Sequence, residues 1–269
     1  MKILIGDVGN TITKFCLIEN RTFKIKKIIY FDSNKIINGR YIKKKLNAII
    51  KKNTVNKIAL FSSVVPKYQY ILKKNLYKLY KIKLKEIKDK NINKLIKINI
   101  KNKKQVGSDR IANAVGVYSK YKSNCIVLDF GTATTFDVVT KNGNYNGGII
   151  APGVNLSIKS LSNSADQIPV FSIKKQNKII GKNTIEALRS GFYWGYSGLI
   201  NNIILKIEKE TKKNYKIIFT GGYADLFKTS IVKPFKIDRN ITIEGIIEIF
   251  KKNNYKLIKW KKKNLFFAL

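Results

Sequence analysis

The apolar positions in the first half of the chain predict a small sheet with helices packed against it. Nearly continuous apolar runs indicate buried strands, and apolar residues three or four apart indicate one face of a helix. Strands are expected over residues 2–8, 14–19, 21–32, 58–61 and 83–87, and helices over residues 41–51 and 68–80. The basic, polar stretch 88–104 has no clear period and is expected to be loop or short strand.

A helix is expected over residues 109–121, and the second half of the chain begins after it. A hairpin set is expected over 124–150, a helix over 151–164, a long helix over 184–211, a strand over 216–219 and a helix over 242–250. Gly191, Gly195 and Gly198 interrupt the long helix, and close helix packing explains them better than a subunit interface does. The pattern predicts two lobes, residues 1–119 and 120–269.

The charge of the chain is extreme, with a formal net charge of +38 over 269 residues. A dedicated nucleic-acid surface usually gathers its charge in one patch or tail, whereas these lysines are spread along the whole sequence. We therefore interpret the charge as compositional drift on a solvated surface and expect no specific nucleic-acid partner. The hydrophobic fraction of 44% is close to the average of globular proteins and is sufficient for a real core.

Two residue types narrow the possible chemistry. The chain has no histidine, which excludes Ser-His-Asp and Cys-His catalysis and any histidine-bound metal. Its two cysteines, Cys16 and Cys125, cannot form a four-thiolate site and are expected to be buried free thiols, because both fall in apolar runs. No signal peptide or membrane-spanning run is visible, so a cytoplasmic protein without a membrane partner is expected.

Asp7 and Asp129 each stand where an apolar strand meets a glycine turn. A single aspartate in such a place would most simply cap its turn. The repeated context favours cation and phosphate handling at a duplicated hairpin instead. No Gly-x4-Gly-Lys-(Ser/Thr) loop exists, so backbone N–H groups in the two turns would form the anion site. The residues expected to hold phosphate there are Asn10, Thr11, Lys14 and Thr132.

Asp109 and Arg110 are the other candidates for chemistry. If a phosphoryl group bound at these turns is transferred to an alcohol, the reaction needs a group that orients the hydroxyl and accepts its proton, and without histidine a carboxylate is the natural choice. Alternatively, Asp109 could cap the following helix and Arg110 could form a surface pair with it. Arg110 is one of only five arginines in a lysine-rich chain, which favours a bidentate contact with a substrate carboxylate.

Four motifs follow one another along the chain: Asp7-Val8-Gly9-Asn10-Thr11 with Lys14, Gly107-Ser108-Asp109-Arg110, Asp129-Phe130-Gly131-Thr132-Ala133-Thr134-Thr135 and residues 147–153. Residues 62–66, 181–184 and 220–222 add further matches. Together they resemble type III pantothenate kinases, within the acetate kinase/sugar kinase/Hsp70/actin superfamily. The resemblance implies an α/β fold of two lobes, an actin-like (ribonuclease H-like) duplicated fold whose mixed sheets are flanked by helices. It also implies ATP-dependent phosphorylation of pantothenate to 4′-phosphopantothenate, the first step of coenzyme A biosynthesis, by a homodimer.

The resemblance assigns roles to individual residues. Asp109 would be the catalytic base, Asp7 would hold Mg²⁺ largely through water, and Asp129 would hold a monovalent cation, K⁺ or NH₄⁺. The ATP-binding residues would be Asp7, Val8, Gly9, Asn10, Thr11, Ile12, Thr13, Lys14 and Thr132. The substrate-binding residues would be Gly107, Ser108, Asp109, Arg110 and Thr184.

Some positions depart from the family pattern or admit another interpretation. Ile100 stands where the family usually has a substrate-contacting tyrosine, Lys103 where it has a proline, and Ser108 where it has an alanine. Thr184 matches a substrate-contacting threonine whose site a partner subunit would complete, or it caps the long helix. The alternative function is that of a non-catalytic family member, a basic regulatory protein that binds nucleic acid. A sugar or acetate kinase is disfavoured by the Gly-Ser-Asp-Arg sequence.

Overall fold

The computed structural model describes residues 1–50 and 53–266, and the side-chain environments of residues 1–50 and 53–253. The chain forms two compact units. Unit 1 comprises Met1–Lys120 together with the segment from Ile241 onward, and unit 2 comprises Tyr121–Asn240. The sequence-based division put the segment from Ile241 with the second lobe, whereas its contacts group it with the first.

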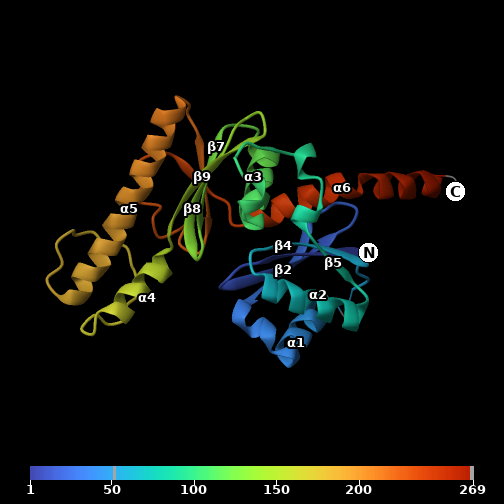
Figure 1. Ribbon diagram of the computed structural model, residues 1–269, viewed down its shortest axis with the longest axis horizontal. Helices are drawn as coiled ribbons and strands as arrows, with labels where there is room; N and C mark the ends of the chain where they lie inside the picture. Colours follow the sequence, from blue (N-terminus) through green and yellow to red (C-terminus); the bar gives the residue numbers. More distant parts are fainter. Residues whose placement is uncertain (51–52, 267–269) are drawn as a thin grey trace. The chain divides into compact units, whose positions relative to one another are not determined.

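The sheet of unit 1 has the strand order β3-β2-β1-β4-β5. Figure 1 labels β2, β4 and β5 of this sheet. Its strands are β1 (Lys2–Val8), β2 (Ile12–Glu19), β3 (Ile25–Asp32), β4 (Ile58–Ser63) and β5 (Lys83–Glu86). β1 runs antiparallel to β2 and parallel to β4. Ile3, Leu4 and Ile5 are consecutive and all fully buried, so both faces of the sheet are covered.

Helices cover the two faces of this sheet. Helices α1 (Gly39–Ile50) and α2 (Pro66–Tyr80) pack on one face, where Leu46 and Leu76 join a core that includes Phe61. Helix α6 (Ile241–Phe266) contacts β1 and β4. It also crosses α3 (Ser108–Tyr121) closely, because a Cβ at Gly245 would lie 1.8 Å from the carbonyl oxygen of Ala112. This crossing explains why the last helix belongs to unit 1.

The stretch between β5 and α3 consists of short elements, as the lack of periodicity predicts. They are η2 (Ile87–Asp89), η3 (Ile92–Lys94), β6 (Lys97–Ile98) and η4 (Lys103–Gln105). A further short helix, η1 (Ser33–Ile37), joins β3 to α1. Ile100 is half-buried just after β6, and Lys103 is exposed as the first residue of η4.

Unit 2 is built around strands in the order β11-β10-β7-β8-β9. The strands are β7 (Cys125–Phe130), β8 (Ala133–Val139), β9 (Asn144–Pro152), β10 (Lys216–Gly221) and β11 (Phe235–Ile237). β7 runs antiparallel to β8 and parallel to β10. Helices α4 (Val154–Ser164) and α5 (Thr184–Thr211) share a core with one face of this sheet, where Tyr193 stacks on Phe227.

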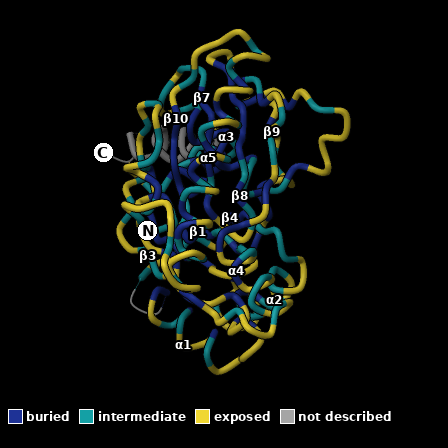
Figure 2. Tube along the Cα trace, turned by 90° about the vertical axis from the view of Figure 1, so that its left-hand side faces the viewer, coloured by how far each residue is buried: buried dark blue, intermediate teal, exposed yellow. Residues whose placement is uncertain are grey.

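The predicted α/β class, with mixed sheets flanked by helices, is confirmed. Figure 2 shows that the buried residues are concentrated in the strands. Cys16 and Cys125 are buried free thiols, as expected, and burial raises the pKa of Cys16 to about 12. Among the described residues, no helix is long and apolar enough to cross a membrane.

Candidate active site

The first hairpin places three polar groups side by side. Asp7 is the penultimate residue of β1, and its cross-strand partners are Lys14 on β2 and Ser62 on β4. Because paired residues project from the same face of a sheet, the side chains of Lys14 and Ser62 leave the sheet on either side of Asp7 and on the same face. The Ser62 hydroxyl is buried and has no hydrogen-bond partner within the described part of the chain. Such an oxygen is a site where a ligand or water can bind.

The turn of this hairpin is tight and exposed at its tip. The Gly9 N–H donates to the carbonyl oxygen of Ile12 over 3.2 Å, and Asn10 and Thr11 between them are exposed. A Cβ at Gly9 would lie 2.9 Å from that oxygen, so glycine is required here.

The other residues of this segment divide by burial. Val8 and Thr13 are fully buried, and the Thr13 hydroxyl lies 2.8 Å from that of Ser33. Among the residues predicted to bind ATP, these two therefore have only their backbone to offer. Ile12 is 49% exposed, and Lys14 is half-buried opposite Asp7.

The second hairpin repeats the arrangement in unit 2. Asp129 is the penultimate residue of β7, and its partners are Thr135 on β8 and Thr220 on β10. Both threonine hydroxyls are buried and lack a hydrogen-bond partner among the residues described. An aspartate flanked by a hydroxyl on the parallel neighbour thus occurs in each unit. The antiparallel neighbour differs, being a lysine in unit 1 and a threonine in unit 2.

Two glycines make room for the turn that follows Asp129. The Gly131 N–H donates to the carbonyl oxygen of Ala133 over 3.1 Å. A Cβ at Gly153 would lie 2.1 Å from the carbonyl oxygen of Thr132. The residue Thr132 is exposed. Gly221 has φ of +87°, a conformation that favours glycine, and a Cβ there would lie 2.7 Å from Asp129 Oδ1. Motifs 147–153 and 220–222 therefore surround the second turn.

The start of α3 fixes the Asp109 carboxylate. Asp109 is the second residue of the helix, which begins at Ser108. Its Oδ1 accepts a hydrogen bond from the Arg110 N–H over 2.8 Å. A Cβ at Gly107 would lie only 2.4 Å from the same oxygen. The missing side chain of Gly107 is therefore the space that this carboxylate occupies.

Hydrogen bonds tie this helix start to the strand that carries Asp7. The Ser108 hydroxyl donates to the carbonyl oxygen of Ser63 over 3.2 Å, at the end of β4. One residue further, the Val64 N–H donates to the carbonyl oxygen of Val8 over 3.2 Å, at the end of β1. Unit 1 thus brings the first and second predicted motifs together through the exit turn of β4.

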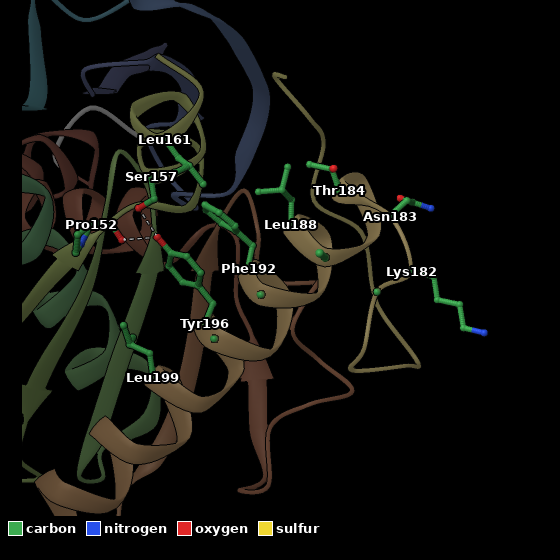
Figure 3. A pocket seen from close by; sticks show the side chains of 14 residues that line it. Pro152, Ser157, Leu161, Lys182, Asn183, Thr184, Leu188, Phe192, Tyr196 and Leu199 are labelled. Atoms are coloured by element: carbon green, nitrogen blue, oxygen red, sulfur yellow. Dashed lines mark hydrogen bonds between the residues drawn. The ribbon is translucent and has the colours of Figure 1, made fainter. Parts of the chain in front are cut away.

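Thr184 lies beside an apolar hollow of about 920 Å³ between α4 and α5 of unit 2. In Figure 3, Phe192 and Tyr196 of α5 point toward α4, and Lys182 points away. The Tyr196 hydroxyl lies 2.7 Å from that of Ser157. Asn183, not Thr184, caps α5, because its side chain accepts a hydrogen bond from the Glu186 N–H over 2.9 Å.

The glycines of α5 do not pack against another helix within the described part of the chain. No described atom lies within 4 Å of a Cβ built on Gly191, Gly195 or Gly198, and all three are exposed. The preference for close helix packing at these positions was therefore wrong. Gly191 and Gly195 line the hollow instead.

Sequence reasoning missed the hydroxyls on the strands parallel to the two aspartates. Ser62 and Thr220 both fall in recognised motifs, but no role was given to them. The signal was present in the predicted topology, because a strand parallel to each hairpin would carry one residue level with each aspartate. No group of three or more acidic or cysteine side chains suited to a metal ion occurs in the described part of the chain. Any cation would therefore rely on few carboxylates.

Comparison with known proteins identifies relatives over most of the chain. The sequence model of the type III pantothenate kinase family matches residues 3–206. A type III pantothenate kinase from Pelagibacter ubique (strain HTCC1062) is 51% identical over 245 residues, covering 91% of this chain and 97% of that protein. Another, from Citrifermentans bemidjiense, is 34% identical over 247 residues, covering 92% of this chain and 88% of that protein.

Solved structures share the fold at much lower identity. A Campylobacter jejuni protein that carries the name of the Baf transcriptional activator family has a TM-score of 0.61 at 21% identity, over 94% of this chain and 99% of that one. The archaeal actin homolog Ta0583 has a TM-score of 0.51 at 12% identity, over 94% and 100% of the two chains. At such identities the likeness concerns the fold alone.

Proposed function

The chain belongs to the family of type III pantothenate kinases, and we propose how its own residues divide the work of that reaction. The protein transfers a phosphoryl group from ATP to pantothenate, which gives 4′-phosphopantothenate for coenzyme A synthesis. Family membership rests on the match over residues 3–206 and on a relative that is 51% identical over nearly the whole chain. The alternative of a non-catalytic, nucleic-acid-binding regulator is not favoured, since these relatives are kinases by name.

Asp109 is the residue we assign as the base. It would accept the proton of the substrate hydroxyl while that oxygen forms its bond to the γ-phosphorus and the bond from phosphorus to the ADP oxygen breaks. The observation that carries this role is the fixed carboxylate, held by the Arg110 N–H at 2.8 Å in the space left by Gly107. Arg110 would bind the pantothenate carboxylate through its planar guanidinium. Gly107 and Ser108 form the backbone of the same binding segment.

The first hairpin is our assignment for the phosphates of ATP and for Mg²⁺. The exposed tip of Asn10 and Thr11 offers backbone N–H groups, and Lys14 offers a positive charge. Asp7 is the ligand suited to Mg²⁺, which keeps several waters and needs few carboxylates. The Ser62 hydroxyl on the neighbouring strand, left without a partner by the residues that the structure describes, suits a water of that ion. When bound, Mg²⁺ would neutralise charge on the phosphates.

The second hairpin fits a monovalent cation. Asp129 supplies one carboxylate. The hydroxyls of Thr135 and Thr220, which have no hydrogen-bond partner among the described residues, supply neutral oxygens on either side of it. Oxygen ligands of low total charge suit K⁺, and an ammonium ion could donate to the same atoms. The cation would offset the repulsion between Asp129 and phosphate. Thr132, exposed on the adjoining turn, is the ATP-binding residue we assign in this unit.

A homodimer accounts best for the hollow between α4 and α5. Its walls are mostly apolar, and Ile179 and Ile180 nearby are 69% and 80% exposed. Contiguous apolar surface of this kind usually marks a binding partner. The bare glycines of α5 would let a second α5 approach closely. Thr184 at the rim would then reach substrate with help from that second copy. Free cysteine thiols fit a cytoplasmic site for the enzyme.

The decisive experiment is a coupled assay of ADP release with and without pantothenate. We expect release that depends on pantothenate, and mass spectrometry should find the phosphorylated product. The same preparation tests the alternative, through binding to duplex DNA in rising salt. ADP release indifferent to pantothenate, together with sequence-selective DNA binding at physiological salt, would contradict the assignment.

A further inference from the structure

Glu86 is a buried carboxyl outside the residues assigned so far. It is the last residue of β5, lies level with Phe61 of β4 and is 9% exposed. Its Oε2 accepts a hydrogen bond from the Lys88 N–H over 2.5 Å, and its own N–H donates to Asp89 Oδ2 over 3.2 Å. These two bonds form a capping box at η2. Of the two carboxyl oxygens of Glu86, only Oε2 takes part in them.

The carboxyl of Glu86 lies near Ser108, the first residue of the helix that carries Asp109. Oε1 is buried and forms no hydrogen bond of ordinary distance and angle with any described residue. The Ser108 hydroxyl nevertheless lies close enough to Glu86 to lower its pKa. That hydroxyl has a single hydrogen, which it donates to the carbonyl oxygen of Ser63 over 3.2 Å. Two acceptors, on β4 and β5, therefore compete for one hydrogen at the start of α3.

We propose that Glu86 is a positioning residue for the segment that carries Asp109 and Arg110, acting through Ser108. While Glu86 is neutral, Ser108 donates to Ser63 and ties the segment to the exit turn of β4. When Glu86 is ionised, the Ser108 hydrogen turns to the carboxylate and the tie to Ser63 is lost. This inference rests on the proposed role of Asp109.

The surroundings of Glu86 move its titration toward neutral pH. Burial is the largest influence and raises the pKa of Glu86 above the ordinary value of a glutamate. The Ser108 hydroxyl, the Lys88 N–H and the Lys88 charge act in the opposite direction, and the Asp89 charge raises the pKa further. The net effect is a raised pKa of Glu86. The neutral form, and with it the tie to Ser63, persists to higher pH than for an exposed glutamate.

Three variants separate this role from simple capping. Glu86→Gln keeps an acceptor for the Lys88 N–H and holds an uncharged donor toward Ser108, so it mimics the neutral form at every pH. Ser108→Ala removes the shared hydrogen and leaves the capping box intact. Glu19→Gln is the matched control, since Glu19 is a surface residue of the same unit whose carboxyl accepts a hydrogen bond from the Thr22 hydroxyl and pairs with Lys26 Nζ at 3.4 Å.

The first readout is a carbon-13 NMR titration of the glutamate side chains, with the Glu86 signal assigned by its absence in Glu86→Gln. We expect a pKa above the ordinary range in wild type, and a higher one in Ser108→Ala, because a hydrogen bond to the charged form is lost. The titration needs no activity, so it remains decisive if the assigned reaction is wrong. An unchanged Glu86 pKa in Ser108→Ala overturns the proposal.

The second readout is the pH profile of kcat/KM for pantothenate in the full-length protein. In the wild type, kcat/KM should fall by about three- to tenfold as Glu86 ionises, because that factor corresponds to the loss of one ordinary hydrogen bond. Glu86→Gln should lack this loss, Ser108→Ala should show the lower value throughout, and Glu19→Gln should follow wild type. A Glu86→Gln profile that keeps the wild-type decline overturns the proposal, and so does a Ser108→Ala profile with the same decline.

Discussion

Replacing Gly107 with alanine should damage catalysis far more than folding. The new methyl carbon would lie 2.4 Å from Asp109 Oδ1 and at an ordinary contact distance of 3.6 Å from Val64 Cγ1. Contact between non-bonded heavy atoms begins at about 3.4 Å, so the carboxylate must move by about 1 Å. The backbone need not change, because Gly107 is not among the residues with positive φ. The perturbation therefore falls on the side chain of Asp109.

The size of the effect follows from that displacement. A misplacement of about 1 Å in a reacting group costs on the order of 10²-fold in rate, so kcat should fall by about that factor. The free energy of unfolding should change by about 1 kcal/mol or less, since the group that yields is the end of a flexible side chain. Steady-state ADP release and urea denaturation measure the two quantities on the same preparations.

Gly39→Ala is the control for this comparison. Gly39 begins α1 in the same unit, and nothing lies within 4 Å of a Cβ built there. We expect wild-type activity from it. A Gly107→Ala enzyme that turns over as fast as Gly39→Ala would refute the inference that Gly107 exists to make room for the Asp109 carboxylate.

Three further substitutions test the remaining assignments. Asp129→Ala should abolish activation by K⁺ over Na⁺ at constant ionic strength, and wild-type rates equal in both salts would argue against a cation there. Gly195→Arg places a charge in the α5 hollow and should halve the mass measured by light scattering, whereas a persisting dimer would place the interface elsewhere. Gly245→Ala should lower the free energy of unfolding by about 1–3 kcal/mol, because its Cβ meets the backbone of Ala112 at 1.8 Å; an unchanged urea midpoint would contradict the close crossing.

Local chemistry made the hairpins predictable from the sequence. An apolar strand, an aspartate and a glycine turn are neighbours in the chain, so Asp7 and Asp129 could be placed at strand ends without knowledge of the tertiary structure. The long helix was also predicted with its observed bounds, Thr184–Thr211, although Gly191, Gly195 and Gly198 interrupt it. What determines these features lies within a few residues of each position.

Features that depend on distant segments were not predictable in the same way. Glycines in the middle of helices looked alike in sequence, yet those of α5 are exposed whereas Gly116 and Gly245 meet other backbone closely. Which helix face meets another helix is a tertiary property. The same holds for β11, three residues that form a strand only by pairing with β10. The competition for the Ser108 hydrogen joins residues more than twenty positions apart along the chain.

The most direct test of the account is the turnover of Asp109→Asn. The substitution keeps the size of the side chain and an oxygen for the Arg110 N–H, but it removes the group that accepts the proton. We predict that pantothenate-dependent ADP release falls by roughly two to four orders of magnitude, while ATP binding and the unfolding midpoint stay at their wild-type values. A loss of less than about tenfold in a folded, ATP-binding variant would contradict the assignment of Asp109 as the base.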